Sequence, residues 1–207
     1  MVSIIDYGAG NLTSVARALR HIGVACRITK RHDEILAAER VIFPGVGAAG
    51  KAMEVIRREG LDGVIREVIA RGRPFLGICL GAQIILGESE EDNHTPCLGI
   101  IPGSAKRFHG ADITIPHMGW NDISVTRPHP LLAGVDPRAQ FYFVHSYYPA
   151  PEKQEDIIAT TDYGIPFASV IGHGTVIATQ FHLEKSGRHG LHVLKNFCSW
   201  NGRVSIC

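Results

Sequence analysis

Short apolar runs alternate with segments of helical periodicity through the first half of the chain. The apolar runs predict strands at 2–6, 25–29, 41–43 and 75–78. Helices are expected from Asn11, a good N-cap residue, over 33–39 and 49–71 with breaks near Gly60 and Gly63, and from Ala82 onward. This alternation predicts a mainly parallel central sheet with helices on both faces.

The second half has shorter apolar runs separated by turn residues. They predict strands at 113–116, 122–126, 140–145, 157–161, 167–171 and 175–181, with Gly-His-Gly at 172–174 as a hairpin turn. A closing helix is expected over 186–200. Because no repeat or linker interrupts the pattern, we predict one α/β domain over 1–207, with antiparallel strands added in the second half.

Composition and charge narrow the possible functions. The 207 residues carry a formal net charge of +1, which favours neither nucleic acid nor an anionic membrane surface as a partner. No run of about 18 apolar residues occurs, so we expect no membrane span. The opening MVSIIDYGAG does not resemble a signal peptide, and the five cysteines include no C-x-x-C pair. We therefore expect a cytoplasmic protein with reduced thiols.

Neither a metal nor a cofactor is expected. The eleven histidines form no HxxxH or HExxH pattern that would indicate a zinc site. DYGAGN at 6–11 begins like a dinucleotide-binding turn, but Thr13 stands where the third glycine belongs. A lone G-x-G is weak support for a nucleotide site, so we predict none.

The segment FLGICLGAQ at 75–83 has the pattern of a nucleophile elbow. Cys79 stands between Gly77 and Gly81 where a predicted strand meets a helix, and glycines at these positions permit a sharp turn. A cysteine at a helix N-terminus is favoured as the thiolate. The N–H of Leu80 is then placed to stabilise an oxyanion, and Gln83, one turn later, faces the same pocket.

A base for this cysteine is offered by QFHLEKS at 180–186. His182 and Glu184 are two residues apart at a strand end, which puts both side chains on one face, so Glu184 can orient the imidazole. The turn PGVG at 44–47 is a candidate for a second oxyanion donor. His145 is a rival base, but it lacks an adjacent carboxylate, and we interpret it as lining the pocket.

These motifs resemble those of class I, or triad-type, glutamine amidotransferases. GICLGAQ and FHLEKS carry the resemblance, and DYGAGN, PGVG, IPHMGWN and YFVHSYY narrow it to glutaminase subunits of imidazole glycerol phosphate synthases. The resemblance implies a Cys79–His182–Glu184 triad that hydrolyses L-glutamine through a γ-glutamyl thioester on Cys79. It also implies an oxyanion hole at Val46, Gly47 and Leu80. Glutamine is expected to contact Gly47, Gln83, His145, Ser146 and Tyr147.

The resemblance further implies a partner protein. In this family ammonia passes to a cyclase subunit with a (β/α)₈-barrel fold, in a heterodimer that makes imidazole glycerol phosphate and an aminoimidazole carboxamide ribonucleotide during histidine biosynthesis. The residues expected at that interface are Asn11, Pro116, Met118, Trp120, Tyr142 and Lys185. Two positions depart from the family pattern, because Leu183 replaces the usual proline and Ala82 a common methionine.

Three other interpretations remain open from the residues. The chain could be the glutaminase of another synthase, such as those for GMP or anthranilate, although PHMGWN and YFVHSYY argue against this. It could be a cysteine hydrolase of peptides or γ-glutamyl conjugates that needs no partner. It could also be a non-catalytic binding subunit, which the intact Cys79, His182 and Glu184 argue against.

Overall fold

The computed structural model describes residues 1–8, 10–110 and 113–203. Its central sheet has eight strands, in the order β2 (Cys26–Thr29), β1 (Val2–Ile5), β3 (Arg40–Gly45), β4 (Phe75–Cys79), β14 (Val176–Thr179), β13 (Pro166–His173), β12 (Ile157–Asp162) and β9 (Ser124–Val125). The first five strands are parallel and the remaining pairings are antiparallel. β1, β4 and β14 are buried along their whole length, as expected for parallel strands covered on both faces.

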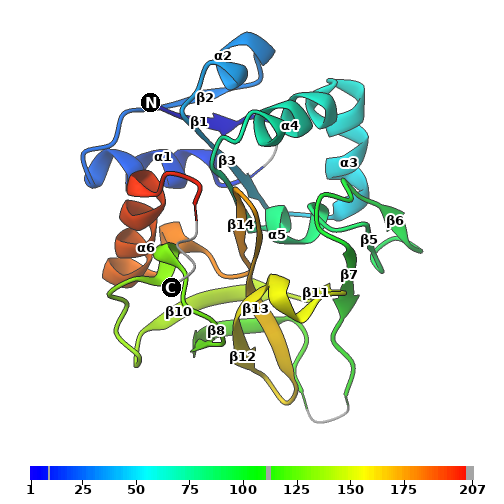
Figure 1. The fold of residues 1–207 in the computed structure, drawn as a ribbon. Coiled ribbons are helices and arrows are strands. Elements are labelled where there is room, and N and C mark those ends of the chain that lie inside the picture. The colour runs from blue at the N-terminus through cyan, green and yellow to red at the C-terminus, as the bar shows by residue number, and fades with distance from the viewer. Residues whose placement is uncertain (9, 111–112, 204–207) are drawn as a thin grey trace.

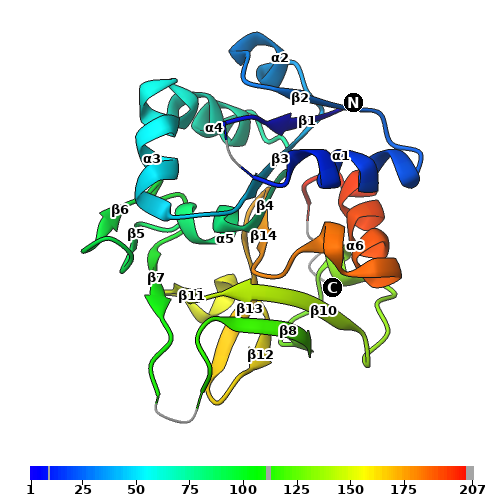
Figure 2. The ribbon, with the colours of Figure 1, turned by 180° about the vertical axis from the view of Figure 1, so that it is seen from behind.

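Helices cover both faces of this sheet (Figures 1 and 2). One face packs against α1 (Leu12–His21) and α6 (Gly187–Ser199), and the other against α2 (His32–Leu36), α3 (Ala49–Arg58), α4 (Leu61–Ala70) and α5 (Leu80–Ile84). Side chains of β1 contribute to the cores on both faces of the sheet. Val2 and Ile4 pack on the side of α1 and α6, and Ile5 packs on the side of α2 to α5. The predicted α/β architecture is confirmed.

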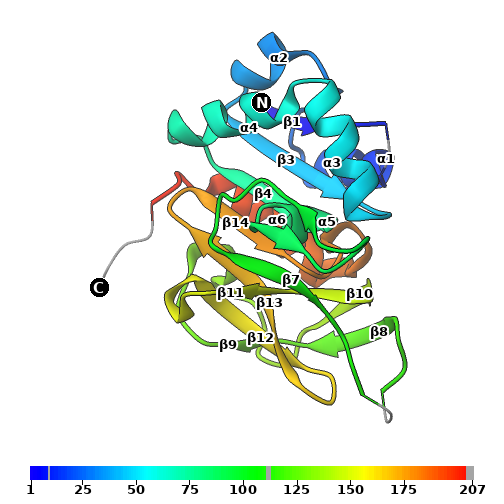
Figure 3. The same cartoon turned by 90° about the vertical axis from the view of Figure 1, so that its right-hand side faces the viewer.

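Two smaller sheets lie beside the antiparallel part of the central sheet (Figure 3). β10 (Gln140–His145) pairs with β8 (His117–Asp122), and β11 (Tyr147–Pro151) pairs with β7 (Gly103–Arg107), which continues to β5 (Glu88–Ser89) and β6 (Thr95–Pro96). Short 3₁₀ turns occur at η1 (Pro130–Leu132), η2 (Gln154–Asp156) and η3 (Leu183–Lys185). The turn from β10 into β11 brings residues 144–147 alongside α5, and this places the wall of the site.

Several sequence predictions in this region were wrong. Residues 113–116 form no strand, since the strand begins at His117, after a proline that cannot donate to a ladder. β8 itself was missed, because its apolar side chains face outward: Met118 is 62% and Trp120 54% exposed. The strand expected over 122–126 shrinks to β9. Gly63 lies inside α4, and the break between the two helices is at Glu59 and Gly60, where Gly60 has φ 66°.

Within the described ranges, no helix has both the length and the apolar character needed to cross a bilayer.

Candidate active site

The joint between β4 and α5 holds Cys79 in an unusual backbone conformation. Cys79 ends the strand with φ 55° and ψ −104°, and the helix begins at the next residue. A Cβ at Gly81 would lie 2.4 Å from the carbonyl oxygen of Phe43, and one at Gly77 would lie 2.7 Å from the carbonyl oxygen of Gly81. Both glycines are therefore required by close backbone approach, which confirms the predicted elbow.

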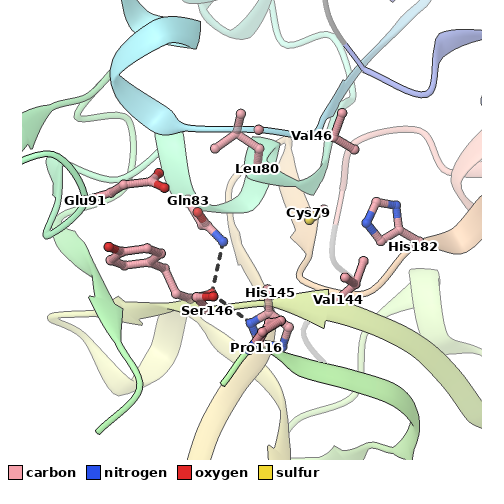
Figure 4. Close-up of a pocket in the computed structure, with 12 residues that line it drawn as sticks. Val46, Cys79, Leu80, Gln83, Glu91, Pro116, Val144, His145, Ser146 and His182 are labelled. Carbon is pink, nitrogen blue, oxygen red and sulfur yellow. Dashed lines mark hydrogen bonds between the residues drawn. The ribbon is translucent and has the colours of Figure 1, made fainter. Parts of the chain in front are cut away.

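The sheet topology brings a histidine to this cysteine from a distant part of the sequence. β14 lies parallel to β4 and pairs Thr179 with Ile78, so the chain leaves both strands at the same edge. His182 follows β14, and its ring lies beside Cys79 (Figure 4). Its Nδ1 donates to Glu184 Oε1 at 2.7 Å, and the two side chains are 2% and 1% exposed. This fixes the tautomer, leaving Nε2 for Cys79.

The electrostatic surroundings keep His182 protonated. Burial lowers the pKa of His182, but its interactions with Cys79 and Glu184 outweigh burial and raise that pKa from 6.5 to about 10. The imidazole is then a cation at neutral pH. A cation beside a cysteine favours the nucleophilic thiolate, which is the form that a cysteine nucleophile requires.

A cavity of about 430 Å³ opens over Cys79 and has the size of a small-molecule site (Figure 4). All of the residues predicted to contact substrate line it, namely Gly47, Gln83, His145, Ser146 and Tyr147. Val46, Leu80 and Pro116 line it as well. Glu91 completes the wall with a carboxylate that the sequence analysis missed, because nothing in the local pattern of the loop at 88–94 distinguishes it from a solvated acid.

His145 does not have a free nitrogen with which to act as a base. Its Nδ1 donates to the carbonyl oxygen of Tyr147 at 2.8 Å, and its Nε2 accepts from His117 Nδ1 at 3.0 Å. Burial lowers the pKa of His145 to about 3 and that of His117 to about 4, so both rings are neutral at neutral pH. These contacts support the interpretation of His145 as a wall of the pocket.

In the turn at 44–47, which was predicted to complete the oxyanion hole, one backbone N–H is already hydrogen-bonded within the protein. The N–H of Val46 donates to the hydroxyl of Tyr7, and that hydroxyl donates back to the Val46 carbonyl, both at 3.3 Å. Burial raises the pKa of Tyr7 to about 12, so the hydroxyl keeps its proton. The expectation of a donor at Val46 is therefore not met in this arrangement, while Gly47 and Leu80 line the cavity.

Comparisons with known proteins agree with this geometry. The family model described as glutamine amidotransferase class-I matches residues 3–200. The chain belongs to the class I glutamine amidotransferase family. It is 53% identical over 204 residues to a protein of Nitratidesulfovibrio vulgaris (strain Hildenborough) named imidazole glycerol phosphate synthase subunit HisH, with 95% of each chain covered. A Pseudomonas putida protein of the same name is 46% identical over 209 residues, with 98% of each covered.

Solved structures of low identity show the same fold. The structure of PurLQS from Thermotoga maritima aligns with a TM-score of 0.74 at 16% identity, covering 96% of this chain and 97% of that one. A glutamine amidotransferase from the same organism aligns with a TM-score of 0.62 at 16% identity, covering 96% of this chain and 80% of that one. The class I glutamine amidotransferase fold is thus confirmed.

Several of the residues expected at a partner interface contact one another or the triad. The ring of Trp120 contacts that of Tyr142, with centroids 5.9 Å apart, and the ammonium of Lys185 lies 5.6 Å from the Tyr142 ring centroid. Contrary to the sequence prediction, the side chain of Asn11 does not cap α1. Its Nδ2 instead donates to Glu184 Oε1 at 3.3 Å, which joins the start of α1 to the triad.

Among the described residues, no group of three or more histidine, cysteine or acidic side chains is arranged to hold a metal ion.

We expect Gly81→Ala to destabilise this amidotransferase by about 1–3 kcal/mol, because the new Cβ would press on the Phe43 carbonyl and overpack the elbow. Gly63→Ala is the matched control. Nothing lies within 4 Å of a Cβ at Gly63, which is exposed within α4, so this change is expected to stabilise the chain by about 0.5–1 kcal/mol. Urea unfolding measures both, and equal effects would contradict the close approach at the elbow.

The Glu184→Gln variant is expected to lose most stability at low pH. A histidine with a raised folded pKa stabilises the fold fully below its unfolded pKa, near 6.5, and this contribution is lost as pH rises through about 10. Removing the carboxylate lowers the pKa of His182 and removes the part of that contribution that Glu184 supplies, while the part from Cys79 stays. The difference in unfolding free energy from the wild type should therefore be largest near pH 6 and shrink towards pH 10. A difference that is constant with pH would contradict the assignment.

Proposed function

We propose that the chain hydrolyses L-glutamine at Cys79 and supplies the ammonia to a partner synthase. The observation that carries this proposal is the buried His182–Glu184 pair, joined at 2.7 Å, beside a cysteine at a strained elbow in a cavity of small-molecule size. The names of the similar proteins, which are synthase subunits and about half identical over nearly the whole chain, support it.

The first half of the reaction forms a thioester. The Cys79 thiolate attacks the side-chain amide carbon of glutamine, and the carbonyl oxygen becomes an oxyanion. The N–H of Leu80 is the first of α5 and has no partner within the helix, so it is placed to stabilise that charge, together with the Gly47 turn. As the carbon–nitrogen bond breaks, the protonated His182 gives its Nε2 proton to the leaving ammonia.

The second half regenerates the enzyme. Neutral His182 takes a proton from water, the hydroxide attacks the γ-glutamyl thioester, and glutamate leaves as Cys79 returns to the thiolate. Glu184 holds the imidazole in one tautomer through both halves. At the far end of the cavity Glu91 offers a carboxylate for the α-ammonium group of glutamine, and the amide of Gln83 faces the same space.

The ammonia is best used without release to water, because protonation would remove its nucleophilic lone pair. We infer that a cyclase subunit docks on the face formed by Asn11, Pro116, Met118, Trp120, Tyr142 and Lys185, and converts the ammonia within a heterodimer. Two large side chains of this face, Met118 and Trp120, are more than half exposed, which is typical of an unoccupied protein interface. The reaction is expected in the cytoplasm, without a cofactor.

The experiment that tests this proposal measures glutamate released from L-glutamine by the pure chain, alone and with the cyclase and its ligand. Cys79→Ala is expected to lower release by at least about 10⁴-fold in both conditions, because no other group replaces the nucleophile. Binding of the variant to the cyclase should be unchanged.

Cys97→Ser is the matched control for the loss of a thiol. Cys97 is half-buried, and burial raises its pKa to about 11, so it is a thiol at neutral pH and lies outside the cavity. This variant should release glutamate at the wild-type rate. Retained activity in Cys79→Ala would sink the proposal, and wild-type activity that ignores the liganded cyclase would refute the coupling to a partner.

A further inference from the structure

Gln180 lies against the sulfur of Cys79, although no part of the reaction described above uses it. It follows β14 directly and precedes His182 by two residues, so both side chains point to the same side while Phe181 packs into the core. Gln180 is fully buried. Its Nε2 lies 3.6 Å from Cys79 Sγ in hydrogen-bonding geometry.

The direction of the Gln180 amide is set by its neighbours. The carbonyl oxygen of Tyr147 can only accept, so Gln83 must turn its NH₂ group towards it, at 3.0 Å. The second hydrogen of that NH₂ points to Gln180 at 3.1 Å, which therefore has to present its Oε1. The Nε2 of Gln180 is left facing the sulfur, so Gln180 is a donor to Cys79.

The donor and acceptor of each bond can also be assigned along a chain of hydrogen bonds that runs from Tyr147 to Asn121 on β8. The Tyr147 carbonyl accepts a second bond from His145 Nδ1 (Figure 4), and His145 Nε2 accepts from His117 Nδ1. The remaining nitrogen of His117 then has to accept, and it does so from Asn121 Nδ2 at 3.4 Å. Both histidines are neutral at neutral pH, so each donates once and accepts once, and the direction of every bond follows.

We propose that Gln180 is a further residue of the reacting centre, which donates a hydrogen bond to the Cys79 thiolate and is held in the donor orientation by Gln83. This inference rests on the proposed function in that Cys79 is taken as the nucleophile. Cys79 is only 6% exposed, so its anionic sulfur has little water to solvate it. A hydrogen bond to a charged acceptor is stronger than one to a neutral acceptor, so the Gln180 amide favours the thiolate over the thiol.

The donor is also suited to the reaction because it is neutral. A second cation at this place would repel the protonated His182 and lower its pKa, whereas an amide stabilises the sulfur without this effect. An amide in the opposite orientation would present its oxygen to the thiolate and repel it. The bond from Gln83 to Oε1 excludes that orientation.

The test is the pH dependence of Cys79 alkylation by iodoacetamide in the full chain, followed by mass spectrometry of the Cys79 peptide so that the other cysteines do not interfere. In Gln180→Met the pH midpoint of alkylation is expected to rise by about one unit, which is about a 10-fold loss of thiolate below the midpoint. Gln180→Glu should raise it further, because a carboxylate adds a negative charge beside the sulfur. It is nearly isosteric and carries the test if Gln180→Met does not fold.

Thr179→Val is the matched control, because it removes a buried hydrogen bond of the preceding residue, from the Thr179 hydroxyl to the Phe181 carbonyl, in which Cys79 takes no part. It should lower the melting temperature and leave the alkylation midpoint unchanged. If the Gln180 variants also lower the melting temperature and leave the alkylation midpoint unchanged, the role of Gln180 is structural and the inference is overturned. If wild-type Cys79 reacts no faster at neutral pH than the other cysteines, the proposed function fails instead.

Gln83→Met tests the orienting step separately. Without the bond to Oε1 the Gln180 amide is free to turn, so the midpoint is expected to rise by less than in Gln180→Met. An unchanged midpoint would overturn the part of the inference that assigns the orientation to Gln83.

Discussion

The approach of the β3 backbone to the first turn of α5 sets the geometry on which the rest of the site depends. Because a Cβ at Gly81 would lie 2.4 Å from the Phe43 carbonyl, the helix can start this close to the sheet only with glycine there. That closeness accompanies the strained conformation of Cys79, at φ 55°, and Cys79 lines the cavity. The neighbouring parallel strand β14 then delivers His182 to the same edge, as expected for a site at the carboxyl ends of parallel strands.

Three buried histidines at this edge differ in charge because their neighbours differ. Burial alone favours a neutral histidine. It lowers the pKa of His145 to about 3 and that of His117 to about 4, so both rings are neutral at neutral pH. At His182 the adjacent Glu184 and Cys79 reverse the outcome and keep the ring charged. The protein thus holds one protonated and two neutral histidines close together. His117, one of the two neutral histidines, lies on β8, the strand that also carries the exposed Met118 and Trp120.

Features formed by residues close together in the sequence could be predicted from the sequence. The elbow needs two glycines and a cysteine within five residues. His182 and Glu184 do pair, but through the 3₁₀ turn η3 and not along a strand as expected, because β14 ends at Thr179. Contacts between segments that are far apart in the sequence could not be predicted. The bond between Tyr7 and Val46 spans 39 positions and that between Gln83 and Gln180 spans 97, and neither leaves a local pattern. β8 was missed because its large apolar side chains face outward, so no core-facing apolar run marks it in the sequence.

The most direct test of the account is the reaction of the pure chain with a diazoketone analogue of L-glutamine, followed by peptide mapping. Such an analogue is recognised as glutamine and alkylates the nucleophile that attacks it. The account predicts a single adduct, on Cys79, whose formation abolishes glutamate release and is slowed by excess glutamine. An adduct on another residue, or full glutamate release from protein that carries the adduct on Cys79, would contradict it.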